Sequence, residues 1–140
     1  MATIQHLREE HALLVRIVGR LAECIARPVP PPTAELFAVR RELNSTLISH
    51  LRAEDWILYP TLLTSDDANT AAIARQFIDE MGGLAAAFIA YADKWSASAI
   101  ESDWAGYCAE SRDIIEDLTE RIIRENRELY PLAEREKKAA

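Results

Sequence analysis

Cysteine and long uninterrupted apolar runs are what this sequence most clearly lacks. Its 2 cysteines, Cys24 and Cys108, are far apart and form no CxxC pair, so neither a disulfide framework nor a zinc knuckle is indicated. The longest uncharged stretch, residues 81–92, is shorter than the about 20 apolar residues that cross a bilayer. Charged residues at positions 8–10 interrupt any signal-peptide pattern. These observations predict a cytoplasmic protein.

Basic residues are also in short supply. The chain has 16 Lys and Arg against 23 Asp and Glu, which gives a formal net charge of -7. Such a charge repels phosphate backbones and anionic lipid surfaces, so we expect no nucleic-acid partner and no membrane partner. With 49% hydrophobic and 28% charged residues, the composition is that of a packed globular protein and not of a disordered chain. The length of 140 residues predicts a single domain over residues 1–140.

Apolar residues recur every three or four positions along four stretches, which is the period of a helix with one buried face. They predict helices over about residues 4–26, 36–60, 73–95 and 104–131. The second and fourth helices are expected to end at Pro60 and Pro131, and Gly82 with Gly83 to weaken the third. Residues 96–102 would turn the chain, and the charged residues 134–138 would form a solvated end. Short connections force neighbouring helices antiparallel, so the sequence predicts an all-α, up-down-up-down antiparallel four-helix bundle.

The second half of the chain resembles the first. A shift of 70 or 71 residues superimposes the apolar positions of the two halves. The same shifts align His11, His50, Glu54 and Tyr59 with Met81, Arg121, Glu125 and Tyr130. The sequence therefore predicts an internal two-fold repeat of helical hairpins, in which these polar residues face one another.

His50 and Glu54 stand four residues apart, so both side chains can reach a common point on one helical face. Both lie on an apolar stripe, as do His11 and Glu125. Ionised side chains in a bundle core cost several kcal/mol unless they are paired or bound to a metal. Imidazole and carboxylate ligands together suit Fe, Mn or Zn, and helix bundles build metal sites from such inward side chains. The alternative interpretation is a half-hydrated core pair without a ligand.

Four segments carry a family resemblance: EHALL at residues 10–14, HLRAEDWILYP at 50–60, EMGGL at 80–84 and RIIRENRELYPL at 121–132. They resemble the helical motifs of the hemerythrin-like (HHE cation-binding) family. The resemblance implies a four-helix bundle that holds a non-haem di-iron centre, used for oxygen binding, oxygen or iron sensing, or iron and peroxide handling. It further implies that His11 and His50 are imidazole ligands of one iron and that Glu54 and Glu125 are bridging carboxylates.

Two positions depart from the family pattern, because Met81 and Arg121 stand where histidines are expected. The chain has 3 histidines, and His6 falls off the shared face, so a di-iron centre is not expected. Arg121 has a planar guanidinium suited to carboxylates, so it is predicted to clamp Glu54 to Glu125 in place of one metal. Met81 is expected beside this cluster.

Tyr59 and Tyr130 each precede a proline at repeat-related positions. A hydrogen bond from either tyrosine to the cluster is one expectation, and capping or packing is the one the sequence favours more.

The sequence favours a non-enzymatic regulatory, sensor or interaction protein whose di-iron centre has been partly lost to an ionic network. The alternative is a mononuclear non-haem iron or zinc protein that uses His11, His50, Glu54 and Glu125. The cofactor is accordingly none or a single non-haem ion. A protein partner and a homodimer are both left open.

Overall fold

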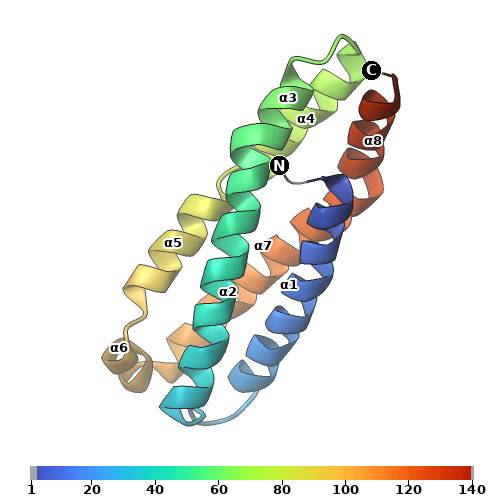
Figure 1. The fold of residues 1–140 in the computed structure, drawn as a ribbon. Helices are drawn as coiled ribbons and strands as arrows, with labels where there is room; N and C mark the ends of the chain where they lie inside the picture. Colours follow the sequence, from blue (N-terminus) through green and yellow to red (C-terminus); the bar gives the residue numbers. More distant parts are fainter. Residues whose placement is uncertain (1–2, 140) are drawn as a thin grey trace.

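The computed structural model describes the backbone of residues 3–139 and the side chains of residues 3–136, and this part of the chain is helical without a strand (Figure 1). The elements in chain order are α1 (Ile4–Ile25), α2 (Thr33–Ala53), a π-helical turn (Glu54–Leu58), α3 (Tyr59–Leu63), α4 (Ala68–Met81), α5 (Leu84–Lys94), α6 (Ala97–Ser102), α7 (Trp104–Arg124), a second π-helical turn (Glu125–Leu129) and α8 (Tyr130–Ala139). The prediction of an all-α fold is confirmed for the described residues.

The long helices contact one another in a closed ring. α1 packs on α2, α2 on α5, α5 on α7, and α7 on α1, and Figure 1 shows α1 and α2 side by side. Local sequence explains the ends of α1. The Thr3 hydroxyl accepts a hydrogen bond from the His6 N–H at its start, and the proline-rich segment 28–32 prevents its continuation. The ring encloses a shared core between the helices.

The helix that begins with α2 does not end at Pro60, contrary to the prediction. A proline lacks the N–H donor, and its ring clashes with the carbonyl four residues earlier in a regular helix. Here the backbone widens into the π-helical turn Glu54–Leu58, closed by a hydrogen bond from the Tyr59 N–H to the Glu54 carbonyl, and Pro60 falls in the first turn of α3. The same happens before Pro131, where the Tyr130 N–H bonds to the Glu125 carbonyl and the chain continues as α8.

The predicted third helix is two helices. α4 ends at Met81, and α5 begins at Leu84 after the pair Gly82 and Gly83, whose low helix propensity favours a break here. The predicted turn over residues 96–102 was wrong in part, because α6 occupies residues 97–102, with the Ser96 hydroxyl accepting the Ala99 N–H at its start.

The charged C-terminal segment is also more ordered than predicted. Its residues are helical up to 139, and Arg8 of α1 donates from Nη2 to Glu134 of α8 at 2.6 Å. The side chains of Lys137 and Lys138, which the sequence places in the solvated end, lie outside the described part of the chain. Within that part, no helix is long and apolar enough to span a membrane.

The buried interior has two hydrophobic clusters with a polar layer between them. The larger cluster includes Leu14, Leu21, Leu47, Phe88, Tyr107 and Leu118, and the smaller one comprises Tyr59, Leu62, Ala74, Phe77, Leu129 and Ala133. The polar layer consists of His11, His50, Glu54, Arg121 and Glu125, each at most 2% exposed. These five residues lie on α1, on α2, on α7 and at the start of the two π-helical turns, and they interrupt the apolar stripes at the same level of the fold.

Candidate metal centre

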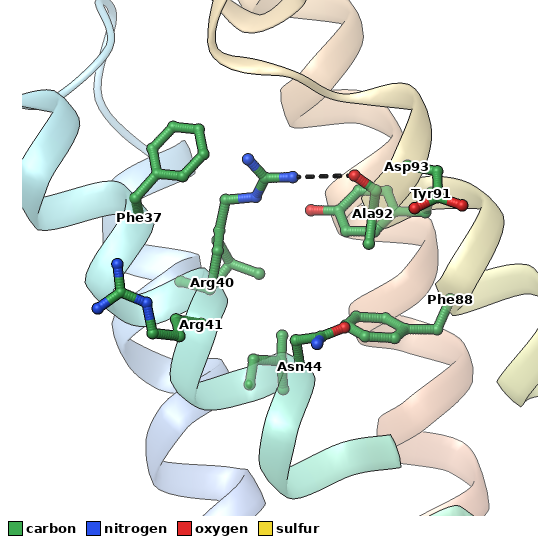
Figure 2. Close-up of a pocket in the computed structure, with 10 residues that line it drawn as sticks. Phe37, Arg40, Arg41, Asn44, Phe88, Tyr91, Ala92 and Asp93 are labelled. Atoms are coloured by element: carbon green, nitrogen blue, oxygen red, sulfur yellow. Dashed lines mark hydrogen bonds between the residues drawn. The ribbon is translucent and has the colours of Figure 1, made fainter.

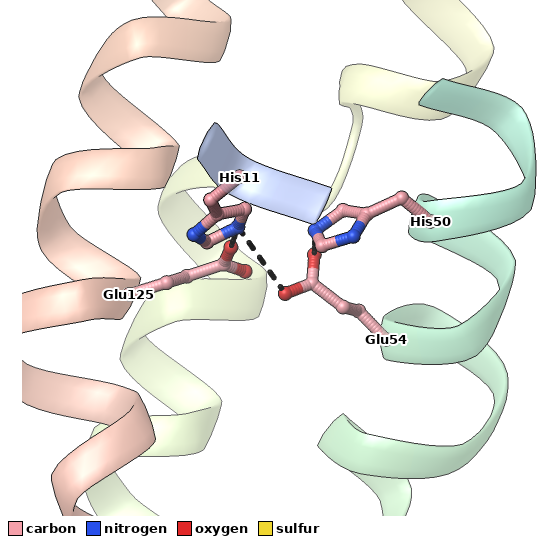
Figure 3. A group of neighbouring side chains, drawn as sticks. All are labelled: His11, His50, Glu54 and Glu125. Atoms are coloured by element: carbon pink, nitrogen blue, oxygen red, sulfur yellow. Dashed lines mark hydrogen bonds and ion pairs between the residues drawn. The ribbon is translucent and has the colours of Figure 1, made fainter. Parts of the chain in front are cut away.

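Four side chains of the polar layer converge on one point (Figure 3). His11 comes from α1 and His50 from α2, while Glu54 and Glu125 are the first residues of the two π-helical turns. One ligand atom from each lies within 4.8 Å of the others. The structure therefore brings together all four residues that the sequence singled out as candidate ligands.

Both histidines are oriented by an outer hydrogen bond. His50 donates from Nδ1 to Oε1 of Glu10 at 2.9 Å, and His11 donates from Nδ1 to Oδ1 of Asn126 at 2.8 Å. Such a bond fixes the ring and the tautomer, which leaves Nε2 free to accept a proton or a metal. Both Nε2 atoms face the carboxylates, at 3.1 Å from Glu125 Oε1 for His11 and 3.3 Å from Glu54 Oε1 for His50.

Arg121 lies beside the two carboxylates and contacts both. Its Nε donates to Glu125 Oε2 at 3.1 Å, and its Nη2 donates to Glu54 Oε1 at 3.2 Å and to Asp55 Oδ1 at 2.7 Å. Its Nη1 donates to the backbone carbonyl of Met81 at 3.2 Å. That carbonyl is available because α4 ends at Met81, and the last carbonyls of a helix have no partner within it.

Met81 lies beside the polar layer, as the sequence predicts. It contacts the layer through its backbone carbonyl and not through its side chain. Its sulfur lies 3.9 Å from Nη1 of Arg124, outside the layer. The helix break at Gly82 and Gly83 accounts for the difference, because it sets the backbone of Met81 beside Arg121.

Tyr59 and Tyr130 complete the hydrogen bonding of the carboxylates across the two halves of the chain. The Tyr59 hydroxyl donates to Glu125 Oε2 at 2.6 Å, and the Tyr130 hydroxyl donates to Glu54 Oε2 at 2.5 Å. The Tyr130 oxygen also lies 3.0 Å from His11 Nε2. Both tyrosines are buried, which agrees with the packing that the sequence favoured, and each also makes the hydrogen bond to the cluster that was the other expectation.

Burial and charge oppose each other in this layer. Burial alone would lower the pKa of His50, but the Glu54 carboxylate beside it and the Glu10 hydrogen bond raise that pKa to about 9. Burial alone would raise the pKa of Glu54, yet His50 and Arg121 hold it below the usual range. Burial and the neighbouring Glu54 charge raise the pKa of Glu125. The two carboxylates are thus inequivalent despite their related positions.

A comparison with protein families gives one match, to the hemerythrin HHE cation-binding domain over residues 2–133. The chain belongs to this family. The match extends over nearly the whole chain and confirms the resemblance carried by the four sequence segments. Searches of curated proteins and of solved structures gave no match.

Membership of the hemerythrin family implies cation binding, and the residues present are of types that hold a metal ion. Bonds of about 2.0–2.2 Å to imidazole nitrogen or carboxylate oxygen require donor atoms roughly 3 to 4.5 Å apart, and the observed spacing, within 4.8 Å, comes close to this range. The buried Nε2 of His50 has no well-aligned hydrogen bond within the described residues, although Glu54 is close. A metal ion would satisfy this atom.

The sequence analysis missed three residues that hydrogen-bond to the polar layer of this hemerythrin domain: Glu10, Asp55 and Asn126. A signal for two of them existed, since the shift that aligns Glu54 with Glu125 also aligns Asp55 with Asn126. Glu10 directly precedes His11 in sequence but serves His50 on another helix, which only the packing of α1 on α2 reveals. His6 is 56% exposed at its side chain, off the shared face as predicted.

Proposed function

We propose that this hemerythrin-like domain is a cytoplasmic, non-enzymatic regulatory or sensor protein that binds a single divalent non-haem ion, iron or zinc, through His11, His50, Glu54 and Glu125. Of the two hypotheses raised by the sequence, the mononuclear one has the better support. The observation that carries it is the arrangement of the two imidazoles, each held at Nδ1 by an outer acceptor while Nε2 faces the carboxylates.

The remaining residues of the layer limit the site to one ion in this proposal. Arg121 occupies the place beside Glu54 and Glu125 where the family resemblance implies a second iron, and it has no deprotonated form that could act as a ligand. Its charge opposes a second cation, and its N–H groups orient the carboxylates. When bound, the ion would supply Lewis acidity or, if it is iron, redox chemistry.

Arg121 also supports reversible occupation, which a sensor requires. The guanidinium contacts each carboxylate, so neither would be left as an isolated buried charge after an ion leaves. The tyrosine hydroxyls donate to both carboxylates as well. The domain is therefore expected to remain folded in the ion-free state, and loss of the ion changes the charge of the layer.

The same proposal extends to the architecture. We infer an up-down-up-down four-helix bundle with an internal hairpin repeat. Its support is the closed ring of helix contacts and the two π-helical turns, each of which begins with a glutamate and is followed by Tyr-Pro. The reciprocal bonds of Tyr59 to Glu125 and Tyr130 to Glu54 are the contacts that a two-fold relation predicts.

Metal content by inductively coupled plasma mass spectrometry tests the mononuclear site. Untagged protein purified without chelators from iron-supplemented cells should carry about one iron or zinc per chain. His50→Ala should reduce this to near zero while the helical circular dichroism is retained. His6→Ala is the matched control, because it removes an exposed imidazole at a position outside the layer, and it should leave the metal content unchanged.

Two results would contradict the proposal. Two ions per chain would show that Arg121 does not exclude the second site, and unchanged metal in the His50 variant would place the ion elsewhere. Near-zero metal in the unmodified protein would favour the second candidate, a metal-free interaction module. The observation that favours this candidate is the set of Arg121 bonds to Glu54, Asp55, Glu125 and the Met81 carbonyl.

A further inference from the structure

A pocket lies between α2 and α5, away from the candidate metal centre (Figure 2). None of its lining residues belongs to the polar layer. Its volume is about 290 Å³. Leu21, Leu43 and Phe88 are buried and supply apolar surface, while Arg40 and Asn44 of α2 supply polar groups. In Figure 2 the Phe88 ring extends from α5 towards α2, below the Arg40 guanidinium. We call this the α2–α5 pocket.

Arg40 is the unusual residue of the α2–α5 pocket. Among the described arginines that are not exposed, Arg8, Arg121 and Arg124 each form an ion pair with a carboxylate, whereas Arg40 forms none. A half-buried charge without a counter-ion loses hydration and gains no ionic partner in exchange. The cation is therefore available for an anion that enters the pocket.

The guanidinium of Arg40 is nevertheless held in place. Its Nη2 donates to the Ala92 carbonyl at 3.3 Å, and the group lies over the Phe37 ring at 4.7 Å and the Tyr107 ring at 5.7 Å. One of five N–H donors is used by Ala92, which leaves donors for a two-point bond to a carboxylate. A fixed cation loses less side-chain entropy on binding than a mobile one.

We propose that the α2–α5 pocket binds a small monocarboxylate with an apolar body. The carboxylate pairs with Arg40, with Arg41 at the rim adding positive charge, and the apolar body packs on Phe88 and Leu43. Asp93 also lines the pocket, and its negative charge disfavours a second anionic group on the ligand. The volume of about 290 Å³ is at the low end for small-molecule sites, which favours a small ligand.

Phenylacetate is a suitable probe, with phenylacetamide as its uncharged analogue of the same shape. Titration of the ¹⁵N-labelled protein should give saturable amide shifts for residues around Leu43 and Phe88 with phenylacetate. Phenylacetamide should bind about tenfold or more weakly, because it lacks the charge that pairs with Arg40. Equal affinity for the two compounds, or no saturable shift with either, would overturn the proposal.

Variants at two arginines of α2 sharpen the test. Arg40→Gln should lower phenylacetate affinity about tenfold or more and remove the preference over phenylacetamide. Arg52→Gln is the matched control, because Arg52 is exposed on the same helix and lies over Trp56 outside the pocket, so it should leave both affinities unchanged. If Arg40→Gln does not fold, the comparison of the two compounds on the unmodified protein still decides.

Discussion

The polar layer and the larger hydrophobic cluster occupy the same ring of helices but follow opposite rules. The cluster is filled with aliphatic and aromatic side chains, and outside the polar layer the buried polar or charged residues of the described chain are Thr70 and Ser111. The polar layer places two carboxylates, two imidazoles and a guanidinium in the same interior. Burial of this kind costs more than apolar packing unless each charge is paired, so the layer depends on its hydrogen bonds and ion pairs in a way that the cluster does not.

The two regions also differ in the hydrogen bonding of particular buried oxygen atoms. In the polar layer, every carboxylate oxygen of Glu54 and Glu125 has a nitrogen or hydroxyl partner within 3.2 Å. In the hydrophobic cluster, the Tyr107 hydroxyl is buried without a hydrogen-bond partner in the described residues. Removal of a hydroxyl that contacts a carboxylate should therefore be costly in the first region, and removal of the Tyr107 hydroxyl should be inexpensive in the second.

The largest effect is expected from Arg121→Leu. This change leaves two buried carboxylates without their cation and should reduce the free energy of unfolding by about 3–5 kcal/mol in protein treated with chelator. Urea denaturation followed by circular dichroism measures it. Arg112→Leu is the control, because Arg112 is exposed on the same helix, and a change of less than about 0.5 kcal/mol is expected there. A loss below about 1 kcal/mol for Arg121→Leu would mean that the layer is hydrated.

Tyr130→Phe should have the next largest effect. It removes the hydroxyl that donates to Glu54 Oε2 and leaves that buried acceptor unpaired, which should cost about 1.5–3 kcal/mol in urea denaturation. A change under about 0.5 kcal/mol would show that another donor replaces the hydroxyl. Tyr107→Phe in the larger hydrophobic cluster is the matched control.

Asn126→Ala tests the outer bond to His11. Loss of an outer partner of a ligand histidine lowers metal affinity about 10- to 100-fold, so the variant should retain its fold and bind zinc or iron(II) that much more weakly in a competition titration with a chelator. An unchanged affinity would indicate that the packing of the ring, and not this bond, orients His11.

Tyr107→Phe should have the smallest effect. The hydroxyl that it removes has no partner in the described residues, so stability should stay the same or rise by up to about 1 kcal/mol in urea denaturation. A loss comparable to that of Tyr130→Phe would contradict the contrast between the two regions and would reveal a partner for this hydroxyl.

Much of the helical framework could be predicted from the sequence because helix formation and burial follow the spacing of apolar residues. The rule that proline ends a helix was less successful. Pro60 and Pro131 predict helix ends in a regular helix, but a wider turn before each removes the conflict. Whether a helix widens or ends is decided by its packing partners, and the local sequence does not contain them.

The sequence identified the four side chains that meet in the candidate site, and Arg121 beside them, but not the rest of their surroundings. His11, His50, Glu54 and Glu125 are identified by polar residues at apolar positions, a signal within each helix. The contacts of Glu10 and Asn126 join different helices, and the Met81 carbonyl is a backbone group that side-chain patterns do not report. These contacts require the three-dimensional packing.

The π-helical turns have a consequence for insertions and deletions. Each turn holds one residue more than an α-helical turn of the same span, so it is equivalent to a single inserted residue. Deleting Asp55 would let the chain regain α-helical pitch and leave the following residues pointing in nearly the same direction relative to Glu54, because five residues of a π-turn and four of an α-helix each complete about one turn. Tyr59 would then still reach the carboxylate of Glu125, and Arg121 would lose its bond to Asp55. These two turns are therefore the places in their helices where the loss of one residue should disturb the register least.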